Sequence, residues 1–138
     1  SITFRYIRYL SPSGAFVNMA EVGFYAPSGE KLVGEIIGTE GSYGNSGDDK
    51  YKLFDGDPLT YFNAPQESRC WGGMAFDRPQ TLGSVMFLPR NDGGRALRVV
   101  LLPRWPVRLP RQAHRGSDAC FTLRQCPREC PAAFEEPY

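Results

Sequence analysis

The stretch Ala20-Glu21-Val22-Gly23-Phe24-Tyr25, followed directly by Ala26-Pro27-Ser28-Gly29, decides the fold class of this chain. A short run of apolar, β-branched and aromatic residues that ends at a turn containing Pro and Gly is typical of a β-strand. Pro27 fixes the φ angle that the second position of such a turn requires. The sequence therefore predicts a strand over residues 20–25 that is closed by a tight turn.

Other short apolar runs repeat this pattern on both sides. In Phe4-Arg5-Tyr6-Ile7-Arg8-Tyr9-Leu10 we expect Phe4, Tyr6 and the Tyr9-Leu10 pair to face a core while Arg5 and the remaining side chains reach solvent, since side chains alternate along a strand. Further strands are expected over Lys31–Ile37 and Gln80–Pro89. Gly38–Asp49 contains four glycines and no apolar run, and an irregular segment of that length is more often functional than filler.

Composition supports one all-β domain over residues 1–138. The chain is 41% hydrophobic, 13% aromatic and 22% charged, with 15 Gly and 12 Pro, which is a globular composition with frequent turns. Its formal net charge of +1 gives no general attraction to nucleic acid or to an anionic membrane. No apolar run approaches the roughly 20 residues that a membrane-spanning helix needs. Neither nucleic acid binding nor membrane insertion is expected.

The character of the chain changes near Gly94. Residues 1–94 carry 8 basic and 11 acidic side chains, whereas residues 95–138 carry 8 Arg, no Lys and 4 acidic side chains. The second segment also holds three of the four cysteines, Cys120, Cys126 and Cys130, while Cys70 lies in the first. The cysteine spacing lacks the paired motifs of a zinc site, and whether these cysteines form disulfides is left open.

Five motifs in the first segment resemble one family. They are Phe4-Arg5-Tyr6-Ile7-Arg8-Tyr9, Asn18-Met19-Ala20-Glu21-Val22, Leu53-Phe54-Asp55-Gly56-Asp57-Pro58-Leu59-Thr60, Trp71 and Leu88-Pro89-Arg90-Asn91-Asp92-Gly93. Together they resemble the discoidin or coagulation factor 5/8 type C family, and in particular its bacterial members grouped with the family 32 carbohydrate-binding modules. The resemblance covers about residues 4–94. It implies a jelly-roll β-sandwich of the galactose-binding type.

The family pattern stops at Gly94, because the Tyr-Glu-Leu strand and the closing strand that usually follow are missing. If the codons of Gln125–Pro137 are read one nucleotide later, synonymous choices permit a leucine-rich family-like sequence, and Leu97-Arg98-Val99 permits Tyr-Glu-Leu in the same frame. One interpretation is a one-base shift between about Asp92 and Leu97. The other is a genuine Arg- and Pro-rich extension of the domain.

The Asp-Gly-Asp-Pro loop offers a candidate metal site. Asp55, Asp57 and Thr60 present hard oxygen atoms across a tight turn, which is the type of ligand that Ca²⁺ takes. The resemblance implies a structural calcium at this loop, together with a distal Glu that the sequence does not identify. The alternative is a metal-free turn in which the carboxylates accept backbone N–H groups.

Candidate ligand-binding residues combine flat aromatic rings with polar groups, which is what recognition of a pyranose requires. Tyr43 in the Gly-rich loop is expected to be the exposed aromatic, with Tyr61 and Phe62 as further rings. Trp71 can stack on a sugar as well, although a strand position before Gly72-Gly73 favours a core role. The polar candidates are Arg69, Arg90, Asn91 and Asp92.

Catalysis is not expected. Glu21 is a possible acid, but the sequence places no second carboxylate beside it, so we expect it to pair with Arg5 or Arg8. A thiol and base formed by Cys70 and His114 have no surrounding signature.

The functional expectation is a non-catalytic carbohydrate-binding module. The glycan would contain galactose or an amino sugar, and the module would concentrate a larger parent protein on it. Because the chain starts at Ser1 without a leader, we expect a mature or excised piece of a secreted, periplasmic or cell-surface protein. The alternative is a protein–protein interaction or architectural β-sandwich domain that has no sugar site.

Overall fold

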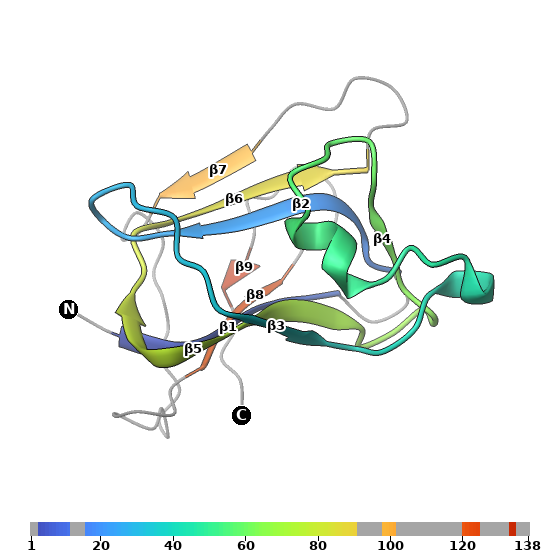
Figure 1. The fold of residues 1–138 in the computed structure, drawn as a ribbon, viewed down its shortest axis with the longest axis horizontal. Helices are drawn as coiled ribbons and strands as arrows, with labels where there is room; N and C mark the ends of the chain where they lie inside the picture. Colours follow the sequence, from blue (N-terminus) through green and yellow to red (C-terminus); the bar gives the residue numbers. More distant parts are fainter. Residues whose placement is uncertain (1–2, 12–15, 91–97, 102–119, 125–132, 135–138) are drawn as a thin grey trace.

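The computed structural model describes residues 3–11, 16–90, 98–101, 120–124 and 133–134, and within them the chain is all-β, with two short 3-10 turns (Figure 1). The strands are β1 (Thr3–Leu10), β2 (Asn18–Tyr25), β3 (Glu35–Gly38), β4 (Phe62–Asn63), β5 (Trp71–Thr81), β6 (Ser84–Pro89), β7 (Arg98–Leu101), β8 (Cys120–Arg124) and β9 (Ala133–Phe134). The 3-10 turns are η1 (Tyr43–Asn45) and η2 (Lys50–Phe54).

The described strands form two sheets that face each other. One has the order β3-β5-β1-β8-β9 and the other has the order β4-β2-β6-β7. All neighbouring strands run antiparallel except β1 and β8, which are parallel. The segment that breaks the composition thus contributes β7 to one sheet and β8 and β9 to the other.

A single hydrophobic core joins the two sheets. It includes Ile7 and Met74 from one sheet and Val22, Phe24 and Val85 from the other, all at most 5% exposed. Burying such side chains provides roughly 1.5–3 kcal/mol each, which is the main force holding the sheets together. Leu53 of η2, which is fully buried, packs into the same core and ties the loop segment to the sheets.

The strands expected over 20–25 and 4–10 are confirmed, but the facing residues of β1 differ from expectation. Phe4 and Tyr9 are buried as predicted, whereas Tyr6 is half-exposed and Ile7 is fully buried. The cause is a break in the register with β5 between Phe4 and Tyr6. Between the pairs Phe4–Gln80 and Tyr6–Ala75, β5 contains more residues than β1, and the buried face of β1 changes at this irregularity.

Two predicted strand boundaries were wrong. The strand expected over Lys31–Ile37 begins only at Glu35, and Lys31 makes an isolated bridge to Tyr25 instead. The strand expected over Gln80–Pro89 is divided, because Gln80 belongs to the end of β5 and β6 starts at Ser84. The chain therefore passes from one sheet to the other, between Thr81 and Ser84, inside the segment that was taken as one strand.

No helix in the described part of the chain is both long and apolar enough to cross a membrane.

Candidate functional site

The strand register brings the loops that carry most of the predicted site residues to one end of the two sheets. Leu10 at the end of β1 pairs with Trp71 at the start of β5, and Gly38 at the end of β3 pairs with Gly72. In the other sheet, Met19 near the start of β2 pairs with Pro89 at the end of β6. We call this end, with residues 39–51, 61–71 and 90, the loop end; it lies on the right in Figure 1.

Tyr43 is an exposed aromatic at the loop end, as the sequence predicted. Its side chain is 56% exposed, and its ring meets Phe16 edge-on at 5.5 Å between centroids. The loop is folded back on itself by the Gly47 N–H, which donates to Ser42 Oγ at 3.0 Å. The ring of Tyr43 is thus supported on one edge while much of its surface faces water.

Trp71 does not join the core, contrary to the favoured expectation. It is half-buried and absent from the core cluster, and the Arg8 guanidinium lies 5.2 Å from its ring centroid. Its backbone N–H donates to Thr39 Oγ1 at 3.1 Å, which anchors the start of the loop after β3. The neighbouring Arg69 is exposed and has a φ of 59°, a left-handed conformation that is uncommon for a residue with a side chain.

Arg90 and Tyr61 form a cation–π pair. The Arg90 guanidinium carbon lies 4.0 Å from the Tyr61 ring centroid, and the Arg90 N–H donates to the Asn18 carbonyl at 3.1 Å. Both contacts fix the arginine beside the start of β2. Phe62, by contrast, is fully buried and belongs to the core. The predicted Asn91 and Asp92 lie outside the described residues.

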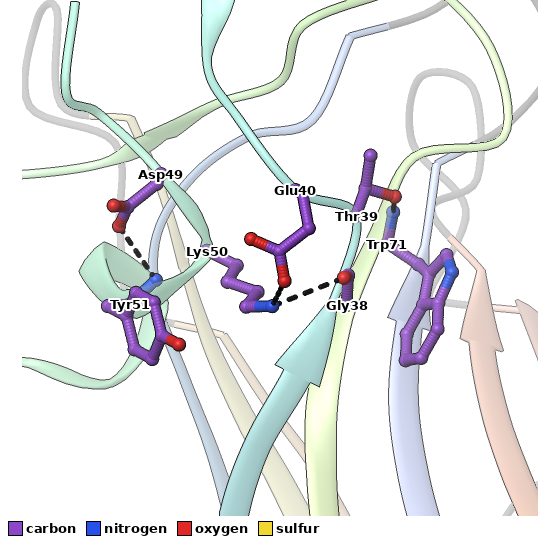
Figure 2. Close-up of polar contacts among 7 residues, drawn as sticks. All are labelled: Gly38, Thr39, Glu40, Asp49, Lys50, Tyr51 and Trp71. Atoms are coloured by element: carbon purple, nitrogen blue, oxygen red, sulfur yellow. Dashed lines mark hydrogen bonds and ion pairs between the residues drawn. The ribbon is translucent and has the colours of Figure 1, made fainter.

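A buried lysine closes the loop that carries Tyr43. Lys50 Nζ forms an ion pair with Glu40 and donates to the Gly38 carbonyl at 3.3 Å (Figure 2). The side chain of Lys50 is 6% exposed and that of Glu40 is 85% exposed. The pair therefore joins the two ends of the loop, with the lysine beneath it and the carboxylate at its surface.

The Asp-Gly-Asp-Pro loop is held by its own hydrogen bonds. Asp55 Oδ1 accepts from the Asp57 N–H at 3.0 Å, and Asp57 Oδ1 accepts from the Leu59 N–H at 2.9 Å. Thr60 Oγ1 donates to Asp55 Oδ2. Gly56 has a φ of 74°, which explains why a glycine occupies this position. These are the contacts of the metal-free turn considered above.

Glu21 faces this loop, and sequence reasoning missed the contact. The buried Glu21 carboxyl has its pKa raised to about 8 by burial first, then by a hydrogen bond to Asp55 and the negative charge of that residue. Burial also pulls the pKa of Asp55 upward, but hydrogen bonds from Glu21, Thr60 and the Asp57 backbone outweigh it and hold that pKa below its usual value. The protonated Glu21 carboxyl thus donates a hydrogen bond to the ionised Asp55 carboxylate. The charge of Lys31 and a hydrogen bond from the Gly56 backbone act in the opposite direction and lower the pKa of Glu21. The expected pairing of Glu21 with Arg5 or Arg8 stays a prediction.

Glu21 adds to the Asp-Gly-Asp-Pro loop an oxygen atom that could bind a calcium ion. Glu21 Oε1 is buried and has no hydrogen-bond partner, and buried acceptors are normally satisfied. Two carboxylates, a threonine hydroxyl and backbone carbonyls are the ligand types that Ca²⁺ takes. Within the residues described, no three side chains of His, Cys, Asp or Glu gather as a metal-binding group, so carbonyl or water oxygens would have to complete the shell.

Two features of the loop end could have been noticed in the sequence, whereas the contact of Glu21 with the Asp-Gly-Asp-Pro loop could not. Tyr51, which is 52% exposed, follows Lys50 directly, so the cation and the ring are adjacent in the chain. An acid, Glu40, and a base, Lys50, lie near the two ends of the Gly-rich loop. The contact between Glu21 and Asp55 depends on how η2 packs on β2, which no local pattern encodes.

Cys70 is a free, fully buried thiol whose Sγ donates to the Gln66 carbonyl at 3.5 Å. His114 and the other three cysteines lie outside the residues whose side chains are described, so their pairing stays open.

Comparison with models of known protein families finds no match, and no curated protein and no solved structure matches the chain. The discoidin-like assignment therefore stays a prediction from the motifs.

Proposed function

We propose that this chain is a non-catalytic carbohydrate-binding module, built as a jelly-roll sandwich of the galactose-binding type, and that the loop end is its glycan-binding surface. The observation that carries the proposal is Tyr43, an exposed ring held edge-on by Phe16. The family motifs and the two facing sheets support the same conclusion. A parent protein at the cell surface or outside the cell would be held on its glycan through this module.

The chemistry of sugars suits such a surface. The C–H face of a pyranose packs on an aromatic ring, while arginine and amide groups satisfy its hydroxyls. An unmatched isomer leaves those polar groups without partners, and this difference provides selectivity. Because a shallow surface buries only part of each sugar, we expect weak binding of single sites that is strengthened by multivalency.

The two carboxyls that lie together support a binding role over hydrolysis. Glycosidases of the usual two-carboxylate type hold the pair about 5 to 9.5 Å apart, so that a sugar or water fits between them. Glu21 and Asp55 are in direct hydrogen-bond contact, and Glu21 is buried. We propose instead that Glu21, Asp55 and Thr60 bind a structural Ca²⁺ that fixes the loop, with Asp57 completing the turn.

The alternative class is a protein–protein interaction domain. Leu59 is 77% exposed within the Leu53–Thr60 motif and is the apolar side chain that such a partner could contact. A partner that binds through Leu59 rather than through Tyr43 would favour this class.

The test is glycan binding by the Tyr43→Ala variant. Binding to galactose- or amino-sugar-terminated oligosaccharides should weaken by about tenfold or more, as expected for the loss of a ring contact of about 1.5 kcal/mol. Val33→Ala is the matched control, because Val33 is 74% exposed and follows the Tyr25–Lys31 bridge at the opposite end of the sheets. Equal binding by both variants would contradict the assignment of the surface.

A further inference from the structure

The ion pair between Lys50 and Glu40 has an unusual distribution of exposure. The side chain of Lys50 is 6% exposed, whereas the side chain of Glu40 is 85% exposed. A buried ammonium is costly unless a carboxylate compensates its charge. The Glu40 carboxylate compensates this charge from the solvent side of the lysine. A carboxylate that arrives from solution could therefore take the place of Glu40 on Lys50 Nζ.

An aromatic ring lies next to this position. Lys50 Nζ is 5.4 Å from the centroid of the Tyr51 ring, and that ring is 52% exposed. Figure 2 shows Tyr51 on one side of the ammonium, with Gly38 and then Trp71 on the other. The Gly38 carbonyl accepts from the same ammonium and holds it in place. A cation, a fixed carbonyl and an exposed ring thus surround one point at the loop end.

We propose that Lys50 is a carboxylate-recognition residue and that the preferred ligands are acidic sugars, whose carboxylate replaces that of Glu40 on Lys50 while the pyranose ring packs on Tyr51. This inference rests on the proposed glycan-binding function and names the class of sugar. The exchange conserves charge, because one carboxylate leaves the ammonium as another arrives. A neutral sugar cannot make this exchange, since displacing Glu40 would leave the buried ammonium unpaired.

Glu40 is then an internal competitor for the ligand. The fraction of molecules in which Glu40 occupies Lys50 does not bind the acidic sugar, so the apparent affinity is lowered by that fraction. Removing the Glu40 carboxylate should therefore strengthen acidic-sugar binding. A purely structural ion pair gives the opposite result, because losing it would loosen the loop that carries Tyr43.

The experiment compares trisaccharides of galacturonic acid and of galactose, which differ at C6 as carboxylate against hydroxymethyl. Titration calorimetry on the whole chain measures both ligands with wild type, Glu40→Gln and Lys50→Met. We expect wild type to prefer the acidic ligand, and Glu40→Gln to bind it about tenfold more tightly. Lys50→Met should lose the preference for the acidic ligand, because the ammonium that pairs with the carboxylate is gone.

Lys52→Met is the matched control, since it removes the same charge from the same 3-10 turn. It should keep the preference for the acidic ligand. If Lys50→Met unfolds, the Glu40→Gln result decides alone. Equal affinity of wild type for both trisaccharides, or no gain in Glu40→Gln, overturns this inference while leaving the proposed function standing. No binding of any glycan by the folded chain overturns both.

Discussion

The substitution Glu21→Gln tests the carboxyl pair that joins β2 to the Asp-Gly-Asp-Pro loop. Glu21 has an ordinary pKa of 4.5 in the unfolded chain and about 8 in the folded one. The folded state therefore holds a proton that the unfolded state releases between these values. This contribution to stability is complete below pH 4.5 and is lost as the pH rises through 8. Asp55 is ionised in both states over this window, so it adds no slope of its own.

The change in pKa sets the size of the effect. At about 1.4 kcal/mol per pKa unit, the upper bound is about 5 kcal/mol between pH 4.5 and pH 8. Water that enters around the charged carboxylate lowers this bound, so we expect a loss of about 2 to 5 kcal/mol. That is a large part of the roughly 5–15 kcal/mol by which a domain is stable.

Urea denaturation in chelator, from pH 5 to pH 8.5, measures this dependence. Wild type should lose stability steadily with rising pH. Glu21→Gln should be nearly independent of pH, because its amide can donate to Asp55 and cannot ionise. At pH 5 the two proteins should agree within about 1 kcal/mol. Parallel pH profiles for wild type and variant would refute the assignment of the proton to Glu21.

Three further results are expected. Calcium at pH 8 should raise the melting temperature of wild type and have a much smaller effect on Asp55→Ala; an unchanged wild-type value in calcium and in chelator would leave the metal-free turn as the correct account. Gly73→Ala should destabilise the fold by more than about 2 kcal/mol, because its methyl group would clash with the Ile7 carbonyl of the paired strand, whereas a denaturation midpoint equal to that of wild type would show that β1 and β5 do not approach so closely. Phe62→Ala should cost about 3–5 kcal/mol in urea denaturation, and a cost below 1 kcal/mol would contradict its place in the core.

The sequence was informative wherever a local pattern determines structure. The strand over 20–25 and the turn after Tyr25 are local features, and both appear as predicted. The exposure of Tyr43 followed from its place in a glycine-rich loop. The boundary near Lys31 was not predictable in this way, because pairing with β5 rather than β-propensity decides where β3 begins.

The features that escaped prediction depend on contacts between distant segments. The register break after Phe4 reverses the faces of β1 and exchanges Tyr6 for Ile7 in the core. Trp71 was expected in the core, yet it lies half-buried beside Arg8. The sequence predicted no second carboxylate beside Glu21, but the packing of η2 on β2 places Asp55 there. Each case follows from tertiary packing that no window of sequence contains.

The most direct test of the account is a glycan array probed with this chain in calcium and in chelator, after circular dichroism has shown that the protein is folded. The account predicts binding to galactose- or amino-sugar-containing glycans, with the strongest signals on those that carry a uronic acid, and weaker binding in chelator. A folded chain that binds no glycan in calcium would contradict it and would leave the protein–protein interaction domain as the remaining class.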